Sequence, residues 1–408
     1  MTAPAAPART PVPASIWILL SVVFVNLAGF ALILPLLPFF AQSLDAAAWQ
    51  VTIMFSAYSV GQFFAEPFWG RLSDRIGRKP VLIATTLANV AGYLALVFAP
   101  TIWWAVGIRF FTGLGAGNIS TIQGYVADVT PPAERAGRMG LLGAAFGMGF
   151  VLGPAIGGLL SRDDMGPAGY HPPLYAAAAM AALAGLGVIL FVKESRARSA
   201  PDAPRQRFLA GLREARDHKV ISRVLLVTFV YMAAFAGMES TFGLWAGEEF
   251  GWGAREVGLN FAVVGVVAAI TQALIVGRLG RRFGEARVVA FGVLLFGASL
   301  FLQTVHHQQW LIPVLTGVGV FGQALAMPSI SALISRSASP DKQGQMLGLN
   351  MAAGSASRML GPIAAGALYS AFGAEVPFIV GALLVIPAAL MAINAGRVFR
   401  REQAREAG

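Results

Sequence analysis

Twelve apolar stretches, each about 20 residues long, run through this chain and constrain its fold more than any other feature. Inside a bilayer every backbone polar group must be satisfied within the protein, so stretches of this length are predicted to be helices. The predicted helices cover residues 16–40, 49–69, 80–99, 102–126, 138–160, 173–192, 220–246, 256–276, 287–305, 309–334, 344–370 and 375–396. We therefore predict an all-α polytopic membrane protein with twelve transmembrane helices.

The composition excludes several classes of protein. Only 12% of the residues are charged, against about 25% in a water-soluble globular chain. The chain has no cysteine, which excludes disulfides, thiolate catalysis and cysteine-ligated metals. No phosphate-binding loop of the G-x-x-x-x-G-K type and no paired catalytic carboxylates are visible, so we expect neither an ATP-driven protein nor an enzyme. No cofactor and no metal are expected.

The basic residues predict the topology. With the N-terminus inside, 26 of the 30 lysines and arginines fall in segments on the cytoplasmic side. Such an excess marks the cytoplasmic face of a membrane protein. We therefore expect a cell inner-membrane location with both termini in the cytoplasm. The formal charge of +10 then reflects topology and not a nucleic-acid partner.

One long polar segment divides the chain. Residues 193–219 carry twelve charged residues, and Pro201 and Pro204 prevent a continuous helix. Residues 206–217 could form a short amphipathic helix on the membrane surface. The expected organisation is a flexible tail (1–15), a six-helix bundle (16–192), a linker (193–219), a second six-helix bundle (220–396) and a tail (397–408).

The two halves repeat each other. GRLSDRIGR at residues 70–78 matches GRLGRRFGE at 277–285, an offset of 207. GPAIGG at 153–158 matches GPIAAG at 361–366, an offset of 208. Both pairs occupy the same place in their halves, which indicates two pseudo-symmetric halves in parallel orientation.

The segment Gly70–Lys79 resembles the loop signature of the major facilitator superfamily. The resemblance implies the twelve-helix fold of that family and a latch between the halves on the cytoplasmic side. The plainer alternative is a basic loop that sets topology. Asp74 lies among cations and can meet an arginine or a helix N-terminus. The candidate gating residues are Gly70, Asp74, Arg75, Gly77 and Arg78.

Two further motifs lie inside predicted helices. The segment Arg109–Gly117 resembles the fourth-helix motif of the family, which implies a role for Arg109 in proton coupling; a structural hydrogen-bond hub is the alternative. The segment Gly149–Gly158 resembles a motif of proton-driven exporters, and close helix packing is the alternative. Its candidate residues are Gly149, Gly153, Pro154, Gly157 and Gly158.

Within the family, Leu34–Pro38 and Ala145–Gly147 are similar to the tetracycline-efflux class of drug:proton antiporters. The likeness covers most of the N-terminal half. Members of that class have an aspartate in the first and in the third helix, where this chain has Asn26 and Gly92. The proton-binding carboxyl is therefore expected elsewhere.

Two acidic residues, Glu66 and Glu239, lie clearly within the predicted helices. Because burial disfavours a charged carboxylate, such groups can bind and release protons. We predict Glu239 as the leading protonation site, with Arg358 as its charge partner; a static pair that fixes helix packing is the alternative. Glu66 either binds protons or belongs to the network of the latch.

Polar and aromatic residues inside the helices are candidates for the substrate cavity. Several of them recur at a spacing of four and so share one helix face. For each one alone, hydrogen bonding between helices is an alternative role. The candidates are Asn26, Tyr58, Gln62, Asn118, Gln123, Tyr231, Phe235 and Asn350.

These features predict a secondary active transporter that exports small apolar or amphipathic compounds such as drugs in exchange for protons, by alternating access. The alternative is a proton-coupled symporter or a facilitator of a metabolite. A non-transporting membrane receptor or a membrane enzyme ranks below both. The expected partners are a small-molecule substrate, protons and the lipid bilayer, and the chain is expected to work as a monomer.

Overall fold

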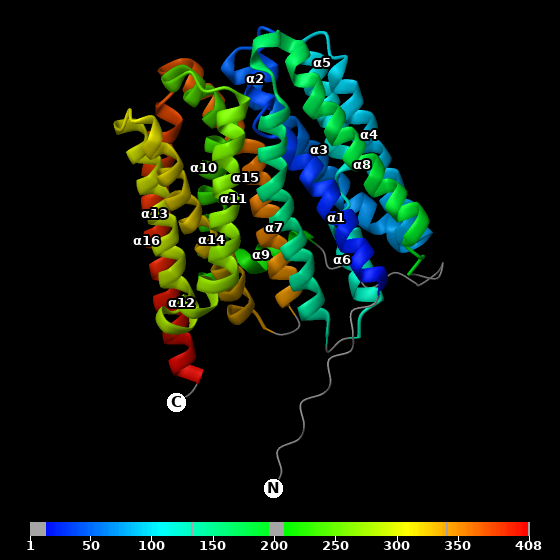
Figure 1. Cartoon of the computed structure of the whole chain (residues 1–408). Helices are drawn as coiled ribbons and strands as arrows, with labels where there is room; N and C mark the ends of the chain where they lie inside the picture. Colours follow the sequence, from blue (N-terminus) through cyan, green and yellow to red (C-terminus); the bar gives the residue numbers. More distant parts are fainter. Residues whose placement is uncertain (1–13, 132–133, 196–207, 340–341, 407–408) are drawn as a thin grey trace.

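The structure of the chain is a computed structural model that describes residues 14–131, 134–195, 208–339 and 342–406. These residues form helices joined by short turns, and none of them lies in a β-strand. The predicted all-α fold class is therefore confirmed (Figure 1). Most of the tail predicted at residues 1–15, and residues 196–207 of the predicted linker, lie outside the described residues.

Among the described residues, the N-terminal half has eight α-helices and the short 3-10 helix η2. Their bounds are α1 (Ala14–Ile33), α2 (Leu37–Gln42), α3 (Ala48–Ile76), α4 (Arg78–Val97), α5 (Ile102–Gly115), α6 (Ile119–Asp128), α7 (Arg135–Leu160), η2 (Asp163–Tyr170) and α8 (His171–Phe191). Two of the predicted spans are broken. Pro35 lies between α1 and α2, and Gly117 lies between α5 and α6.

The linker helix α9 leads into the C-terminal half. The bounds are α9 (Phe208–Asp217), α10 (Lys219–Phe250), α11 (Ala254–Ile270), the π-helix η3 (Thr271–Ile275), α12 (Val276–Phe283), α13 (Glu285–Val305), the 3-10 helix η4 (Gln309–Leu311), α14 (Ile312–Ser337), α15 (Gln343–Phe372) and α16 (Val376–Glu406). Helix α9 falls where the sequence predicts a short amphipathic helix.

Each of the twelve predicted spans is helical. Among the described residues, nine helical stretches are long and apolar enough to cross a membrane by length and composition alone. The three remaining spans are α3, the broken pair α5 and α6, and α15. These three carry Glu66, Arg109 and Arg358, which like Glu239 in α10 need protein or water around them within a bilayer.

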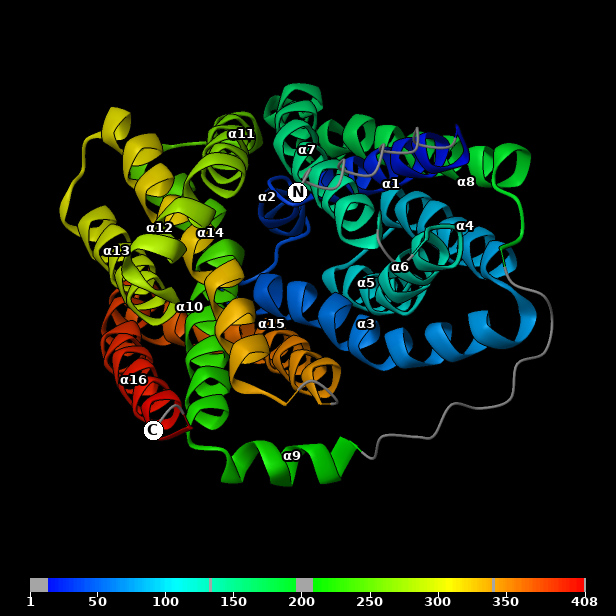
Figure 2. The same ribbon diagram turned by 90° about the horizontal axis from the view of Figure 1, so that it is seen from below.

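The two halves lie side by side when the molecule is viewed along its long axis (Figure 2). Helix α1 begins and α16 ends at the same end of the bundle, which we call the terminal face; the other end is the opposite face (Figure 1). Packing repeats between the halves. Helix α7 packs on α1 as α15 packs on α10, and the same two helices cross to the other half, α7 to α11 and α15 to α3.

The seam between the halves is closed near the opposite face. An added Cβ at Gly258 in α11 would lie 2.5 Å from the carbonyl oxygen of Pro154 in α7, and one at Gly366 in α15 would clash with Thr52 in α3. An added Cβ at Gly243 in α10 would lie 3.0 Å from the Cγ atom of Pro38 in α2. Only residues without bulky side chains allow backbones to approach this closely. The structure therefore represents the state that is closed at the opposite face.

Candidate functional site

The predicted latch signature lies at a tight corner between two helices and not on an extended loop. Helix α3 continues through the signature to Ile76 and α4 begins at Arg78, so Gly77 alone separates them. Gly77 has a φ of +106°, which favours glycine, and an added Cβ there would clash with the carboxylate of Glu194. The corner places Asp74 and Arg78 one turn apart.

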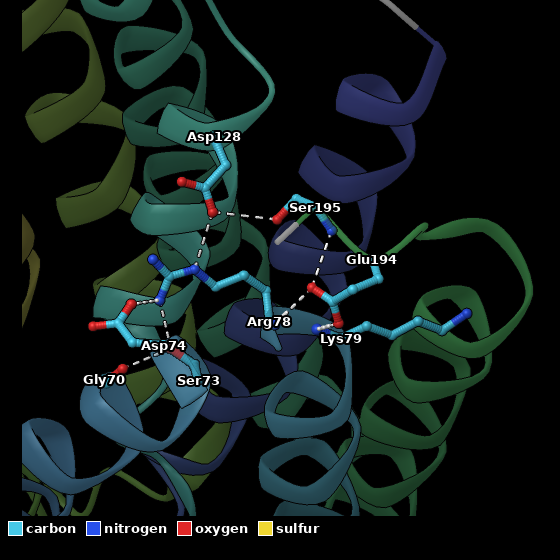
Figure 3. A network of polar contacts seen from close by, with 8 residues as sticks. All are labelled: Gly70, Ser73, Asp74, Arg78, Lys79, Asp128, Glu194 and Ser195. Carbon is cyan, nitrogen blue, oxygen red and sulfur yellow. Dashed lines mark hydrogen bonds and ion pairs between the residues drawn. The ribbon is translucent and has the colours of Figure 1, made fainter. Parts of the chain in front are cut away.

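Arg78 is the centre of a charged network in the N-terminal half (Figure 3). Its buried guanidinium pairs through Nη1 with Asp74 Oδ1 at 2.8 Å and through Nε with Asp128 Oδ2 at 3.2 Å. Nη1 also donates a hydrogen bond to Ser73 Oγ at 2.5 Å. Gly124 leaves room for the guanidinium, because an added Cβ would lie 2.7 Å from its Cζ atom. The network thus joins the ends of α3, α4 and α6 within one half.

Glu194, which the sequence analysis did not single out, completes this network. Its Oε1 accepts a hydrogen bond from the backbone N–H of Arg78 at 2.8 Å, and its Oε2 accepts one from Lys79 at 3.1 Å. These are free N–H groups at the start of α4, where a carboxylate is favourable. Ser195 also donates to Asp128 at 3.3 Å. The start of the linker is therefore held against α4 (Figure 3).

The C-terminal half repeats the corner with the charges reversed. Gly284, offset by 207 from Gly77, also has a positive φ, of +82°, and separates α12 from α13. Glu285 takes the place of Arg78, and it pairs with Arg336 at 2.6 Å at the end of α14. Arg336 is offset by 208 from Asp128. The same two helix ends are therefore joined by an ion pair of opposite polarity.

The remaining gating candidates are placed differently. Gly70 lies against α6, where an added Cβ would be 3.2 Å from Ser120 Oγ. Arg75 is exposed in the last turn of α3. Arg281, at the position that matches Asp74, is exposed on α12. The two corners therefore differ in their charges, with Asp74 in one and Arg281 at the matching position of the other.

Arg109 is fully buried in α5, with 1% of its surface exposed. Its guanidinium lies 4.3 Å from the ring centre of Tyr58 in α3, a cation–π arrangement. In the described part of the chain its Nε and Nη1 groups have no hydrogen-bond partner and no carboxylate lies within ion-pair distance. The break between α5 and α6 places Gly117 against the backbone of Glu66. An added Cβ at Gly117 would lie 2.7 Å from the backbone N atom of Glu66.

The glycine motif of α7 has two faces with different neighbours. Gly149, Gly153 and Gly157 face α1, and an added Cβ at Gly157 would clash with the carbonyl oxygen of Leu32. Pro154 and Gly158 face α11 in the other half, where an added Cβ at Gly158 would lie 2.9 Å from the carbonyl oxygen of Ala254. One motif thus supports both the packing within a half and the seam between halves.

The second copy of the motif does the same in α15. Gly361 packs so closely on Ala233 of α10 that an added Cβ would clash with its carbonyl oxygen. Gly366 faces Thr52 of α3 in the other half. The offset of 208 in the sequence therefore reproduces a pair of contacts in space and not only a string of residue types.

Glu239, Arg358 and Glu66 lie near one another although they come from three helices. Glu239 in α10 is within electrostatic range of Arg358 in α15, and Arg358 is also within range of Glu66 and Tyr58 in the other half. Neither carboxylate forms a direct ion pair with it. Its guanidinium donates to Ser355 Oγ of its own helix at 3.3 Å. Arg358 is thus within electrostatic range of one carboxylate in each half.

The cavity candidates fall into two groups. Some are taken up by packing: Asn118 donates to Thr85 at 3.1 Å, Asn350 accepts from Thr228 at 2.7 Å, and Tyr231 is buried against Phe296. Tyr58 is also buried, and it stacks on Phe30. The others keep part of their surface exposed. These are Asn26, which Asn89 contacts at 3.5 Å; the half-buried Gln62 and Phe235; and the exposed Gln123.

A family model for the Major Facilitator Superfamily matches residues 19–253 and 224–407. The chain belongs to this superfamily. It is therefore a membrane transporter, and the resemblance found in its motifs is confirmed.

Relatives of this superfamily member cover nearly its whole length. Tetracycline resistance protein, class C, of Escherichia coli is 29% identical over 380 residues, which make up 90% of this chain and 94% of the relative. Multidrug resistance protein 2 of Bacillus subtilis (strain 168) is 27% identical over 375 residues, 90% of this chain and 92% of the relative. The crystal structure of the human organic anion transporter MFSD10 covers 93% of this chain and 100% of its own, with a TM-score of 0.67 and 24% identity.

Proposed function

We propose that this transporter exports small amphipathic compounds in exchange for protons. The observation that carries the proposal is Glu239, a carboxyl group deep in α10 that has Arg358 within electrostatic range but no direct ion pair. A carboxyl group in this setting can exchange a proton as the state of the protein changes. The names of the relatives, a tetracycline resistance protein and a multidrug resistance protein, support drug export.

In the proposed cycle Arg358 interacts with carboxylates of both halves, and protonation of Glu239 changes the balance between these interactions. When Glu239 is deprotonated, its negative charge attracts Arg358. When Glu239 binds a proton, this attraction is lost, and Arg358 then interacts mainly with Glu66 and Tyr58 across the seam. Protonation would then change the attraction between the halves and so the population of each state. Arg109, buried beside Tyr58 and without a carboxylate partner in the described chain, adds a fixed positive charge to this region.

The proposed substrate is a compound other than tetracycline. The class resembled in the sequence has an aspartate where this chain has Gly92, and an added Cβ at Gly92 would clash with Thr112 Oγ1 of α5. An aspartate at this position would have to displace the Thr112 side chain. The position of the other aspartate is filled by Asn26, an amide that cannot bind a proton near neutral pH.

We further propose that the terminal face is cytoplasmic and that the membrane is the bacterial inner membrane. Lysine and arginine gather in the segments between spans on this face, and the positive-inside rule assigns such a face to the cytoplasm. The protein in the structure would then be closed toward the outside.

The test follows protons on addition of ligand. A thermal-shift screen of amphipathic dyes, ethidium among them, first identifies compounds that stabilise the purified protein. An antiporter in detergent then releases protons when the compound binds, because substrate and proton exclude each other. We expect Glu239→Gln to bind the compound without releasing protons. The matched control is Glu248→Gln, an exposed carboxylate on the same helix, which should release them as the parent does.

Proton uptake on ligand addition would contradict antiport and favour a symporter. Unchanged proton release by Glu239→Gln would leave export possible but would exclude Glu239 as the coupling site. A screen without any stabilising compound, together with no flux in liposomes under a pH gradient, would contradict the proposed function itself.

A further inference from the structure

One hydrogen bond crosses from one half to the other in the part of the chain that the structure describes. Asp163 Oδ2 accepts it from the backbone N–H of Ala254 at 3.2 Å, although the two residues are 91 positions apart. Asp163 begins η2, just after α7 of the N-terminal half, and Ala254 is the first residue of α11 in the C-terminal half. The bond lies at the opposite face, where the seam is closed.

The start of α11 has a donor left over for this carboxylate. The first N–H groups of a helix have no partner within the helix. Within its own half, Glu256 accepts from the N–H of Gly253 at 2.9 Å. The N–H of Ala254 is then free for Asp163, and the positive end of the helix dipole favours the negative charge.

A glycine is needed at position 253 because of the contact with Asp163, and not because of the backbone conformation. Its φ of −101° and ψ of −170° are extended values that any residue adopts. An added Cβ at Gly253, however, would clash with Asp163 Oδ2. The glycine therefore makes space for a carboxylate that comes from the other half.

The surrounding turn is held in place. Arg162 donates its backbone N–H to the carbonyl of Gly169 at 3.1 Å, which closes the turn that carries Asp163. Directly beside it, Gly158 meets the carbonyl oxygens of Ala254 and Arg255 with hardly any space. The carboxylate is thus presented to α11 by a fixed turn and a closely packed seam.

We propose that Asp163 is a latch that holds the two halves together at the opposite face and must release α11 before the transporter can open there. Only the seam between α7 and α11 has this carboxylate. In the pseudo-symmetric seam between α15 and α3, the matching position at an offset of 208 is Ala371. The latch concerns the change of state that any superfamily transporter performs, and it holds whether or not the substrate and proton coupling proposed above are correct.

The absence of cysteine allows a direct test in the full-length protein in lipid nanodiscs. Thr52→Cys supplies a reporter: Thr52 is 0% exposed and faces Gly366 across the other seam, away from Asp163. A maleimide reaches it only when the halves separate at the opposite face. Asp163→Ala should raise its labelling rate about fivefold, the change expected when a helix N-terminus loses a side-chain acceptor.

Two further variants make the result specific. Asp164→Ala removes the same charge from the next position, which forms no hydrogen bond with α11 in the described chain, and should leave the labelling rate unchanged. Gly253→Ala keeps Asp163, but the added methyl group occupies the space of its carboxylate, so this variant should raise the labelling rate as Asp163→Ala does. The double variant should label no faster than either single variant.

Labelling of Asp163→Ala at the parent rate would overturn the latch. An equal rise in Asp164→Ala would also overturn it, since the effect would then belong to the charge of the turn. Additive effects of Asp163→Ala and Gly253→Ala would show that they act separately and would contradict the shared contact.

Discussion

At the scale of single residues, the two helix corners show that the position of an ion pair can persist while its polarity reverses. Arg78 with Asp128 and Glu285 with Arg336 join the same helix ends in the two halves. The pair needs opposite charges, and its neighbours decide which residue carries which. In the N-terminal half Asp74 and Ser73 both face position 78, so only a cation fits there.

This difference predicts which pair can be inverted. Glu285→Arg combined with Arg336→Glu should have a free energy of unfolding within about 0.5 kcal/mol of that of the parent. The Arg336 side chain is 52% exposed, and pairs with an exposed member contribute about 1 kcal/mol or less. Arg78→Glu combined with Asp128→Arg should lose about 2 kcal/mol or more, since the new glutamate would face Asp74 in a buried place.

Thermal unfolding in detergent measures both exchanges. Each single substitution serves as the control for its pair. If the N-terminal exchange were as stable as the C-terminal one, Asp74 would not fix the polarity of the corner.

At the scale of elements, the glycine motif of helix α7 has two faces with different roles. One face stabilises the N-terminal half, and the other lies in the seam that opens and closes. The face with Gly153 and Gly157 is part of the packing within the N-terminal half. The face with Pro154 and Gly158 is part of the seam, which must open and close. Pro154 removes a backbone hydrogen bond of the helix, and its counterpart Pro362 does so in α15.

Alanine substitutions on α7 should therefore have distinct effects. Gly157→Ala should destabilise the fold by about 1–3 kcal/mol, because its Cβ would clash with the backbone of α1. Gly158→Ala should leave the stability of the half nearly unchanged but raise labelling of Thr52→Cys, because it separates α7 from α11. Gly147→Ala is the control, since an added Cβ there meets open space.

The unfolding midpoint and the labelling rate distinguish these outcomes. Equal loss of stability in Gly157→Ala and Gly158→Ala would contradict the division of the motif into two faces.

At the scale of the whole molecule, the closest backbone contacts between the halves, such as Gly158 with Ala254 and Gly258 with Pro154, lie toward the opposite face. The charged corners of the terminal face keep their partners within one half. Alternating access requires a second set of contacts for the other state. The latch signature at α3 and α4 is proposed to supply these when the terminal face closes.

Orientation in the membrane is open to a simple measurement. Leu212→Cys in α9, on the terminal face, and Met165→Cys in η2, on the opposite face, both replace exposed residues. In intact cells an impermeant maleimide should label Met165→Cys, and it should label Leu212→Cys only after the membrane is permeabilised. The reverse pattern would contradict the cytoplasmic assignment of the terminal face.

The twelve helical spans, the all-α fold class and the internal repeat can all be predicted from the amino-acid sequence. Apolar stretches of this length have one economical structure in a bilayer, and the offsets of 207 and 208 reappear as matching corners and matching glycine contacts. It also identified the charges whose burial needs a reason, among them Glu239 and Arg358, because so few charges lie inside the spans.

The partners of these residues, in contrast, depend on how the helices pack in three dimensions. That Gly158 faces α11, that Glu194 reaches the start of α4 and that Asp163 reaches across to Ala254 depend on segments that are far apart in the chain. An exposed aspartate after a helix carries no local signal of such a role. Its partner is fixed by how the halves are docked, and that arrangement changes with the state of the transporter.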